Sequence, residues 1–394
     1  MTDVLSGIRV LDFGRYIAGP FCAALLGDFG ADVVRIEKRD GSEDRFVQPV
    51  SAHGDGGLFL QMNRNKRSVT VDPMSPGGRD IVRRLVAHSD VVVVNLPQPT
   101  IVAMGLDYET LCAIKPDIVL ASVSAFGRTG PYRDRVGFDG VGQAMSGSVY
   151  MTGTPDQPYR AMASFVDFTT ALACAYGVAL ALLERERTGR GRHVEGTLLG
   201  SALNVSGALV LEQHALRPDR VATGNRAQTS APADLFRTRD GWLLVQVVGR
   251  PLFERCARLI GAPEWLDDPR FATDLSRGEH GAIVSARVGA WCALRSTHEA
   301  LAAFDGARVP CGPVYSPQDV LDDPHVRAAG FFDDVPYPGM DAPAKIARGP
   351  VSLEGGERRI PRRAPLLGEH TDDVLAEAGY SPEEIAAFEA SGAI

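Results

Sequence analysis

Short apolar segments alternate with amphipathic segments along the first two hundred residues. Strands are predicted at residues 8–12, 32–37, 68–72, 90–95 and 117–122. The last two are nearly continuous runs of Val, Ile and Leu, which is typical of strands buried on both faces of a parallel sheet. Helical spacing of apolar positions is found between strands, at residues 19–29 and 78–88. The alternation predicts an α/β fold, with a Rossmann-like large domain built on an open parallel sheet.

The longest uncharged apolar stretch covers residues 168–183 and is bracketed by Asp167 and Glu184. It is shorter than the roughly 20 residues that a helix needs to span a bilayer. We therefore interpret it as a buried helix that begins at Asp167 and ends before the glycines of residues 188–191. A further helix is predicted at residues 200–215.

The pattern changes near the middle of the chain, where residues 217–232 are polar and include Gly and Pro. A strand at 242–248 and helices at 251–260, 283–294, 297–304 and 371–378 are predicted beyond it. Because 394 residues exceed the usual size of one compact domain, we expect two domains. The large domain is expected to consist of residues 1–216 and, after a return segment, its C-terminal part within residues 326–394. A linker (217–232) leads to a smaller α+β domain (233–325).

The net charge of −8 argues against a general nucleic-acid binder, which needs a basic face, but it allows a small anion in a local basic pocket. The turn after the first strand, residues 14–19, does not match a dinucleotide-binding motif, and no phosphate-binding P-loop is found. The dispersed His and Cys residues show no metal-ligand spacing, so we expect no metal site. The N-terminus lacks the pattern of a secretory signal, and the six Cys include no C-x-x-C pair, which favours the cytoplasm.

One acidic residue stands directly before the long apolar helix. Asp167 can be interpreted as a helix N-cap, whose carboxylate accepts backbone N–H bonds. It can also be interpreted as a carboxylate nucleophile that forms covalent intermediates with acyl groups. The two interpretations overlap, because a helix start also supplies N–H donors to a developing oxyanion.

A series of short motifs runs along the chain between residues 7 and 371. They are Gly7-Ile-Arg-Val-Leu-Asp-Phe13, Ala18-Gly-Pro20, Leu26-Gly-Asp-Phe-Gly-Ala-Asp-Val-Val-Arg-Ile-Glu37, Asn63-Arg-Asn-Lys-Arg-Ser68, Gly127-Arg-Thr-Gly-Pro-Tyr132, Gly137-Phe-Asp139, Gln143-Ala-Met-Ser-Gly147, Glu186-Arg-Thr-Gly-Arg-Gly191, Val309-Pro-Cys-Gly-Pro-Val314 and Pro365-Leu-Leu-Gly-Glu-His-Thr371. Each motif is weakly specific alone. The ordered set resembles the family III CoA-transferases of the CaiB/BaiF type, which include formyl-CoA:oxalate, carnitine and succinyl-CoA-dependent enzymes.

The resemblance implies a large Rossmann-like domain and a smaller domain in two interlocked copies of the chain. It also implies that Asp167 is the catalytic carboxylate, which favours the nucleophile over the N-cap. Asp167 would carry the donor acyl group as an anhydride and then CoA as a thioester, before the acceptor carboxylate takes the CoA. The substrates would be an acyl-CoA and a small carboxylic acid, with no cofactor beyond CoA and no nucleic-acid or membrane partner.

The resemblance further assigns CoA-contacting positions at the ends of the predicted strands. Ile17 and Ala18 would lie near the thioester, Lys38 near the nucleotide phosphates, and Arg15 is a candidate clamp for a substrate carboxylate. The remaining positions border the adenosine or flank the pantetheine; they are Val71, Asp72, Pro73, Met74, Asn95, Leu96, Pro97, Val136, Gly137, Phe138 and Asp139.

Some positions depart from the family pattern. Formyl-CoA transferases carry Gln where this chain has Ile17, and a glycine-rich loop where this chain reads Thr223 to Gln228. We therefore expect a larger acyl pair, such as succinyl-CoA with another organic acid, rather than formyl-CoA and oxalate. Many members also read Asn-Phe-Arg-Pro-Gly at residues 95–99 and carry Arg at position 103, so two expected cationic contacts are missing here.

Two other functions stay open at this point. The related 2-methylacyl-CoA racemases move a proton with a His in a Gly-His-Asp segment, but this chain has Phe138 there, and a phenyl ring cannot exchange a proton. A CoA-binding protein without catalysis is the second alternative, and the presence of Asp167 argues against it.

Overall fold

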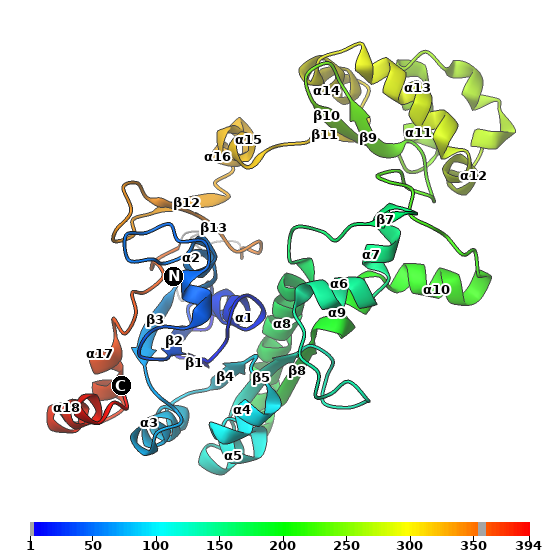
Figure 1. Ribbon diagram of the computed structural model, residues 1–394. Helices are drawn as coiled ribbons and strands as arrows, with labels where there is room; N and C mark the ends of the chain where they lie inside the picture. Colours follow the sequence, from blue (N-terminus) through cyan, green and yellow to red (C-terminus); the bar gives the residue numbers. More distant parts are fainter. Residues whose placement is uncertain (1–3, 354–359) are drawn as a thin grey trace. The chain divides into compact units, whose positions relative to one another are not determined.

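The computed structural model describes residues 4–353 and 360–394 and divides them into two compact units (Figure 1). The large unit is formed by Met1–Ser146, Ala161–Ala208 and Ala329–Ile394, and the small unit by Gly147–Arg160 and Leu209–Ala328. Each unit has its own hydrophobic core. The domain boundaries drawn from the sequence stay predictions.

A six-stranded sheet forms the centre of the large unit, and every neighbouring pair of strands in it is parallel. The order is β3-β2-β1-β4-β5-β8, so the chain reverses its direction of travel across the sheet between β1 and β4. This confirms the predicted α/β class and its parallel sheet. The strands are β1 (Arg9–Asp12), β2 (Asp32–Glu37), β3 (Lys66–Thr70), β4 (Val91–Val94), β5 (Val119–Ser124) and β8 (His193–Thr197).

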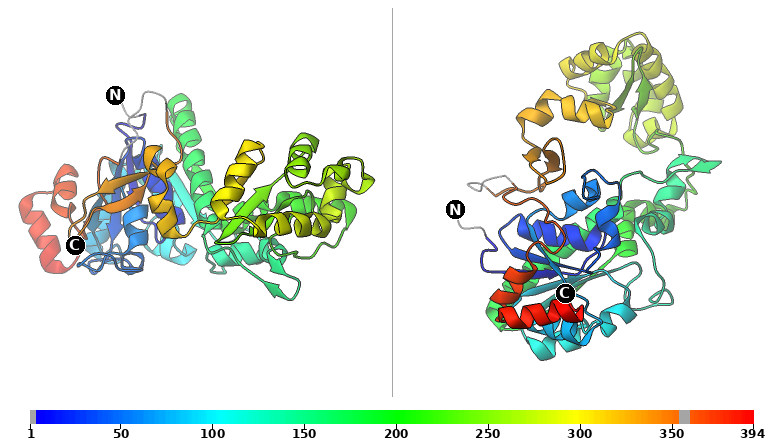
Figure 2. Two further views of the ribbon diagram at one scale, coloured as in Figure 1. Left: turned by 90° about the horizontal axis from the view of Figure 1, so that it is seen from above. Right: turned by 60° about the vertical axis from the view of Figure 1, so that its left-hand side comes forward.

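The side chains of alternate residues in each strand point into two hydrophobic cores, one on each face of the sheet. Val10 and Val93 pack with α1 (Ala18–Gly27) and α8 (Phe165–Thr188). Leu11 points to the opposite face of the sheet, which is covered by further helices. Two of these helices, α17 and α18, come from the C-terminal end of the chain (Figure 2). These helices are α3 (Pro76–Ala87), α4 (Gln98–Ala103), α5 (Tyr108–Ile114), α17 (Thr371–Glu377) and α18 (Pro382–Ser391).

Helix α8 is the long apolar helix predicted from the sequence, and it begins two residues earlier than predicted, at Phe165. It stops at Gly189, whose left-handed backbone (φ 66°) suits the end of a helix. Among the described helices, α8 alone is long and apolar enough to cross a membrane by length and composition. It lies against α1, β5 and β8 and supplies Val166, Cys174 and Val178 to the core. Its opposite side is exposed, so the predicted burial holds for one side only.

A buried network of ion pairs connects residues of the first three strands. Asp12 accepts a hydrogen bond from Lys66 at 2.7 Å, and Arg35 pairs with Asp44 at 2.9 Å. The Asp12 carboxylate also accepts the Gly14 N–H at 2.7 Å, which fixes the turn between β1 and α1. Charges this deeply buried are maintained because each has a partner.

The small unit packs helices on one face of an antiparallel sheet in the order β11-β10-β9. Its predicted strand and helices correspond to β10, α11, α13 and α14. The predicted single helix at 200–215 is wrong, because the structure breaks it at Ser206 into α9 (Leu198–Val205) and α10 (Gly207–Leu216). The elements of this unit are α7 (Ser148–Met151), β6 (Gly153–Thr154), β7 (Gln157–Pro158), β9 (Ala233–Arg237), β10 (Trp242–Gln246), α11 (Arg250–Leu259), α12 (Asp274–Glu279), α13 (Gly281–Ala293), α14 (Thr297–Gly306), β11 (Cys311–Pro313), α15 (Pro317–Asp322) and α16 (Pro324–Ala328).

The chain returns to the large unit after residue 328 as an antiparallel pair of strands, β12 (Phe332–Val335) and β13 (Ala344–Ala347). Val335 and Ile346 of this pair join Phe59 of α2 (Gly57–Met62) in a small separate core. The return segment thus joins the N-terminal part of the large unit by hydrophobic packing.

Candidate active site

Asp167 lies in the first turn of α8 and is partly buried. The helix is capped by a residue from another element, because the Asp139 carboxylate of α6 (Asp139–Met145) accepts the backbone N–H groups of Val166 at 2.8 Å and Asp167 at 3.1 Å. The N-cap position itself is Ser164, which makes no side-chain capping bond. The interpretation of Asp167 as the N-cap is therefore wrong, and its carboxylate is available for other chemistry.

The Asp167 carboxylate receives no hydrogen bond from any residue of the described ranges 4–353 and 360–394. Burial, and then the negative charge of Asp139, raise the pKa of Asp167 to about 7. The ionised form is the one that can act as a nucleophile. A carboxylate that is poorly solvated and has no donor partner is a stronger nucleophile than an ordinary Asp.

Asp139 is itself held firmly. Its side chain is 6% exposed, and the Gln143 amide donates a hydrogen bond to its Oδ1 atom. Gln143 is fully buried and accepts the Ala161 N–H at 2.9 Å. One amide thus ties Asp139 to the segment that leads into α8. The N–H groups of Val166 and Asp167 are used by this cap, so the expectation that the start of α8 offers them to an oxyanion is wrong for these two groups.

The turn after β1 meets the end of β4 at the point where the strand order reverses, which is the usual ligand-binding position in open α/β sheets. The Asn95 side chain accepts the Arg15 N–H at 2.7 Å and donates to the Arg15 carbonyl at 2.8 Å. These two predicted site residues are therefore brought together. One terminal nitrogen of Arg15 donates to the carbonyl of Gly14 at 2.8 Å, which anchors the guanidinium to its own turn.

The same turn approaches the starts of α6 and α8. Ile17 and Ala18 are buried at the start of α1 and share a core with Val166. The rings of Tyr16 and Phe138 meet edge to face with centroids 5.7 Å apart. The turn before α1 thus contacts Phe138, and the core around α1 includes Val166, the residue before Asp167.

The other predicted CoA-binding positions are more dispersed along the carboxyl edge of the sheet. Lys38 follows β2 and forms an exposed ion pair with Glu43. Val71 is fully buried after β3, while Met74 is exposed. Within this group, Asp72 accepts the Met74 N–H, Pro73 is partly buried, Leu96 packs on the core around α4, Pro97 precedes α4, Gly137 is partly buried, and Val136 is exposed.

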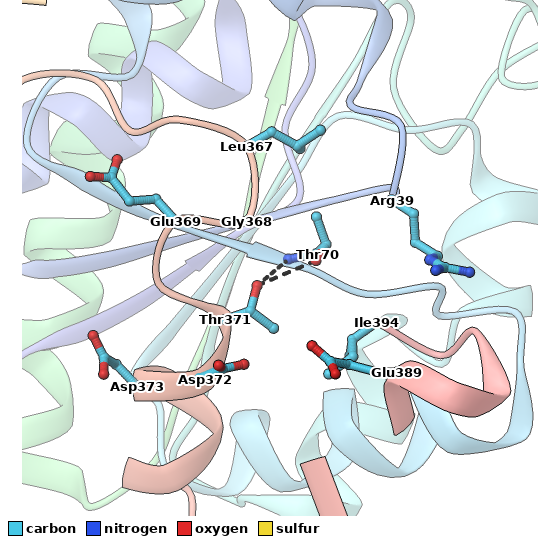
Figure 3. Close-up of a pocket in the computed structure, with 10 residues that line it drawn as sticks. All are labelled: Arg39, Thr70, Leu367, Gly368, Glu369, Thr371, Asp372, Asp373, Glu389 and Ile394. Atoms are coloured by element: carbon cyan, nitrogen blue, oxygen red, sulfur yellow. Dashed lines mark hydrogen bonds between the residues drawn. The ribbon is translucent and has the colours of Figure 1, made fainter. Parts of the chain in front are cut away.

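A cavity of about 590 Å³ lies elsewhere, at the end of β3 beside the start of α17 (Figure 3). Arg39 faces several acidic side chains across it, and the Thr371 hydroxyl accepts the Thr70 N–H at 3.1 Å. Neither Asp167 nor any predicted CoA-binding residue lines this cavity. It therefore gives no support to the predicted substrate site.

Sequence reasoning missed Gln143 as a site residue, although it opens one of the quoted motifs. The signal was present in the spacing: Asp139 and Gln143 are four residues apart, which places them on one face of a helix. Only the fold shows that this face points toward the start of α8.

Comparisons with known proteins identify the class. The model of the family named CoA-transferase family III matches residues 5–371. A succinyl-CoA–D-citramalate CoA-transferase of Chloroflexus aurantiacus is 34% identical over 99% of this chain and 98% of its own length. A succinate–glutarate CoA-transferase of Agrobacterium fabrum is 33% identical over 96% and 98%, and a formyl-CoA:oxalate CoA-transferase of Rhodopseudomonas palustris is 30% identical over 100% and 98%.

The crystal structure of a CaiB/BaiF family protein from Brucella suis is similar over 96% of this chain and 100% of its own, with a TM-score of 0.84 and 31% identity. The chain belongs to the family III CoA-transferases. The predicted resemblance and the prediction of a CoA-transferase enzyme are confirmed.

Proposed function

We propose that this enzyme transfers CoA from an acyl-CoA thioester to a small carboxylic acid, with Asp167 as the covalent carrier. The observation that supports the proposal most strongly is the environment of Asp167. Its carboxylate is partly buried, has no hydrogen-bond donor among the described residues, and lies in the first turn of a helix that packs against α1, which follows the turn where the strand order reverses. Such a group combines nucleophilicity with a position that ligands reach in this class of fold.

The proposed transfer proceeds in four exchanges at carbonyl carbons. Asp167 attacks the donor thioester carbonyl, the C–S bond breaks, and a mixed anhydride and CoA thiolate result. The thiolate attacks the Asp167 carbonyl, which releases the donor acid and leaves an aspartyl-CoA thioester. The acceptor carboxylate displaces the thiolate from Asp167 to give a second anhydride. The thiolate then attacks the acceptor carbonyl, which forms the new acyl-CoA and restores the Asp167 carboxylate.

This scheme consumes no water and changes no oxidation state, so it needs no cofactor beyond CoA itself. Water must be kept away from the anhydride, since hydrolysis would waste the thioester. The burial of Ile17 and Ala18 beside the start of α8 supports this requirement, because apolar atoms border that end of the site.

We further propose that CoA lies along the carboxyl edge of the sheet, with its thioester near Ile17 and Ala18. Lys38 would lie at the phosphates, and residues 71–74, 95–97 and 136–138 along the adenosine and pantetheine. Their positions at the ends of β1, β2, β3 and β4 and before α6 support this path. Asp139 would flank the pantetheine as well, with both of its oxygens held by hydrogen bonds from the chain.

For the substrates, we propose succinyl-CoA as the donor and another organic acid as the acceptor. Two similar enzymes are named for succinyl-CoA or succinate, and Ile17 stands where formyl-CoA transferases carry Gln. The test incubates a panel of acyl-CoA donors with a panel of acids and follows new thioesters by mass spectrometry. Transfer from succinyl-CoA that Asp167→Asn abolishes is expected. Deuterium uptake from solvent at the α-carbon of a 2-methylacyl-CoA, without transfer, would instead establish a racemase.

We also propose that two copies of the chain associate. The outer side of α8 exposes four large apolar side chains spaced at helical intervals, and a patch of this kind on a folded chain marks an interface. They are Leu172, Tyr176, Leu180 and Leu183, and we refer to them as the α8 stripe.

A further inference from the structure

We propose that Asp139, fixed by Gln143, is a positioning residue that holds the start of α8 and uses its own negative charge to favour the acylated forms of Asp167. This inference rests on the proposed function, because it assumes that Asp167 carries acyl groups. It adds a second carboxylate to the account of the reaction, one that touches no reacting atom.

The geometric part of the proposal concerns the backbone. Asp139 Oδ2 accepts the N–H groups of Val166 and Asp167, so one carboxylate oxygen fixes the residue that bears the nucleophile and the residue before it. Gln143 donates to Oδ1 and accepts from Ala161, so the Asp139 carboxylate cannot rotate without breaking its hydrogen bond to Gln143. The carbonyl groups of Ala161 and Ala163 lie within 3.5 Å of the same Gln143 amide nitrogen. The position of Asp167 is thus determined from outside its own helix.

The electrostatic part concerns charge. Each oxygen of Asp139 accepts N–H hydrogen bonds, which is the arrangement that an ionised carboxylate adopts. Repulsion between Asp139 and an ionised Asp167 disappears when Asp167 becomes an anhydride or a thioester, because both are uncharged at that position. Protonation of Asp167 removes the same repulsion. The pKa of Asp167 is therefore raised by burial, which is the larger effect, and by the charge of Asp139. The charge of Asp139 therefore favours both the acylated and the protonated forms of Asp167.

Helices α1, α6 and α9 pack against α8. Asp139 is the one charged group that contributes to the raised pKa of Asp167 among the described residues. The nearby positions from α1 and the turn before it are Ile17, Ala18 and Phe21, which are apolar. From α9, Leu198 and Ala202 are apolar as well. No cation from the described residues offsets the repulsion between the two carboxylates.

The test replaces Asp139 by Asn. An Asn side-chain oxygen can still accept the two N–H groups at the start of α8, but the negative charge is gone. The acidic limb of the pH profile of kcat/KM for the acyl-CoA donor reports Asp167 in the free enzyme. In Asp139→Asn we expect this limb to move to lower pH. We also expect the ratio of acylated to free Asp167 at pH 8 to fall by a factor of about ten for each pH unit of that movement.

Asp107→Asn is the matched control, since Asp107 caps α5 through the Thr110 N–H at 3.0 Å and the same Asp-to-Asn change is made at a helix start. Its acidic limb should stay in place. A limb that does not move in a folded, acylated Asp139→Asn enzyme would overturn the electrostatic role.

If Asp139→Asn does not fold, Gln143→Met decides the matter, because it keeps the charge and removes the clamp. We expect a lower kcat with a limb that does not move to lower pH. An unchanged kcat would refute the positioning role. Failure of the proposed function gives a different result, which is the absence of acyl-Asp167 in the wild-type enzyme during transfer.

Discussion

Two carboxylates at the start of one helix dominate the chemistry at the scale of single residues. Asp139 has hydrogen-bond donors for both oxygens, whereas Asp167 has none among the described residues and lies partly buried. Both residues are Asp, but their different surroundings give them different roles. One carboxylate stabilises the fold, and the other is kept reactive at a cost in folding free energy.

This cost leads to a prediction about stability. The folded-state pKa of Asp167 is about 7 and its ordinary value is 3.8. A raised pKa means that folding is favoured by protonation below the ordinary value and that this stability is lost as the pH rises through 7. Asp167→Asn should therefore raise Tm at pH 8, where the native Asp is ionised, by an amount that corresponds to about 1–4 kcal/mol. The gain should vanish near pH 4.

Thermal unfolding by circular dichroism at the two pH values measures the effect. Asp156→Asn is the control, because Asp156 is exposed in a turn of the small unit, and its Tm should change little at either pH. An Asp167→Asn enzyme that is less stable than wild type at pH 8 would contradict the assignment of Asp167 as an electrostatically strained group.

At the scale of elements, the approach of α8 to the edge strand β8 depends on a glycine. A Cβ atom added at Gly196 of β8 would lie 2.3 Å from the Sγ atom of Cys174 on α8, which is closer than atoms can pack. Gly196→Ala should therefore destabilise the protein by about 1–3 kcal/mol through overpacking. Removal of the sulfur in Cys174→Ala should recover part of the loss, so the double variant should be more stable than the sum of the two single changes predicts.

Denaturant unfolding of the four proteins gives the coupling energy. Gly207→Ala is a suitable control, because a Cβ atom there meets no other atom within 4 Å. Additive effects of Gly196→Ala and Cys174→Ala would show that α8 and β8 do not pack as described.

The elements also show what the sequence could and could not predict. The strands β2 and β4 and the helices α1, α3 and α8 were found because their apolar spacing is strong. Strand β8 was missed, since His193-Val-Glu-Gly-Thr197 contains a single aliphatic side chain and is an edge strand that needs little hydrophobicity. The break at Ser206 was missed because apolar residues continue on both sides of it.

In the candidate active site, too, some features could be predicted from the sequence and others could not. Asp167 was found from its place before an apolar run and from the family resemblance. Asp139 was predicted only to flank the pantetheine, and the structure adds that it caps α8. A contact between residues that are 28 positions apart is set by the tertiary fold, so no local pattern could reveal it.

At the scale of the whole molecule, the proposed association of two copies depends on the α8 stripe. Leu172, Tyr176, Leu180 and Leu183 are between 39% and 67% exposed, which is unusual for four large apolar groups on one helix. We expect the wild-type enzyme to sediment with twice the mass of the chain. Leu180→Asp should weaken the association, because a charge in an apolar interface loses its hydration.

Analytical ultracentrifugation across a range of concentrations measures this. Val4→Asp provides a control, as Val4 is equally apolar and 68% exposed but lies outside the stripe. A wild-type enzyme that sediments as a single chain at every concentration would contradict the proposed pair.

The location of the enzyme in the cytoplasm stays a prediction from the sequence.

The central claim is that Asp167 becomes covalently acylated, and one measurement tests it most directly. The enzyme is incubated with succinyl-CoA without an acceptor, treated with hydroxylamine, digested, and mapped by mass spectrometry. The account predicts a hydroxamate at Asp167 that depends on succinyl-CoA and is lost in Asp167→Asn. Continued transfer by Asp167→Asn, or a hydroxamate at another residue with Asp167 unmodified, would contradict it.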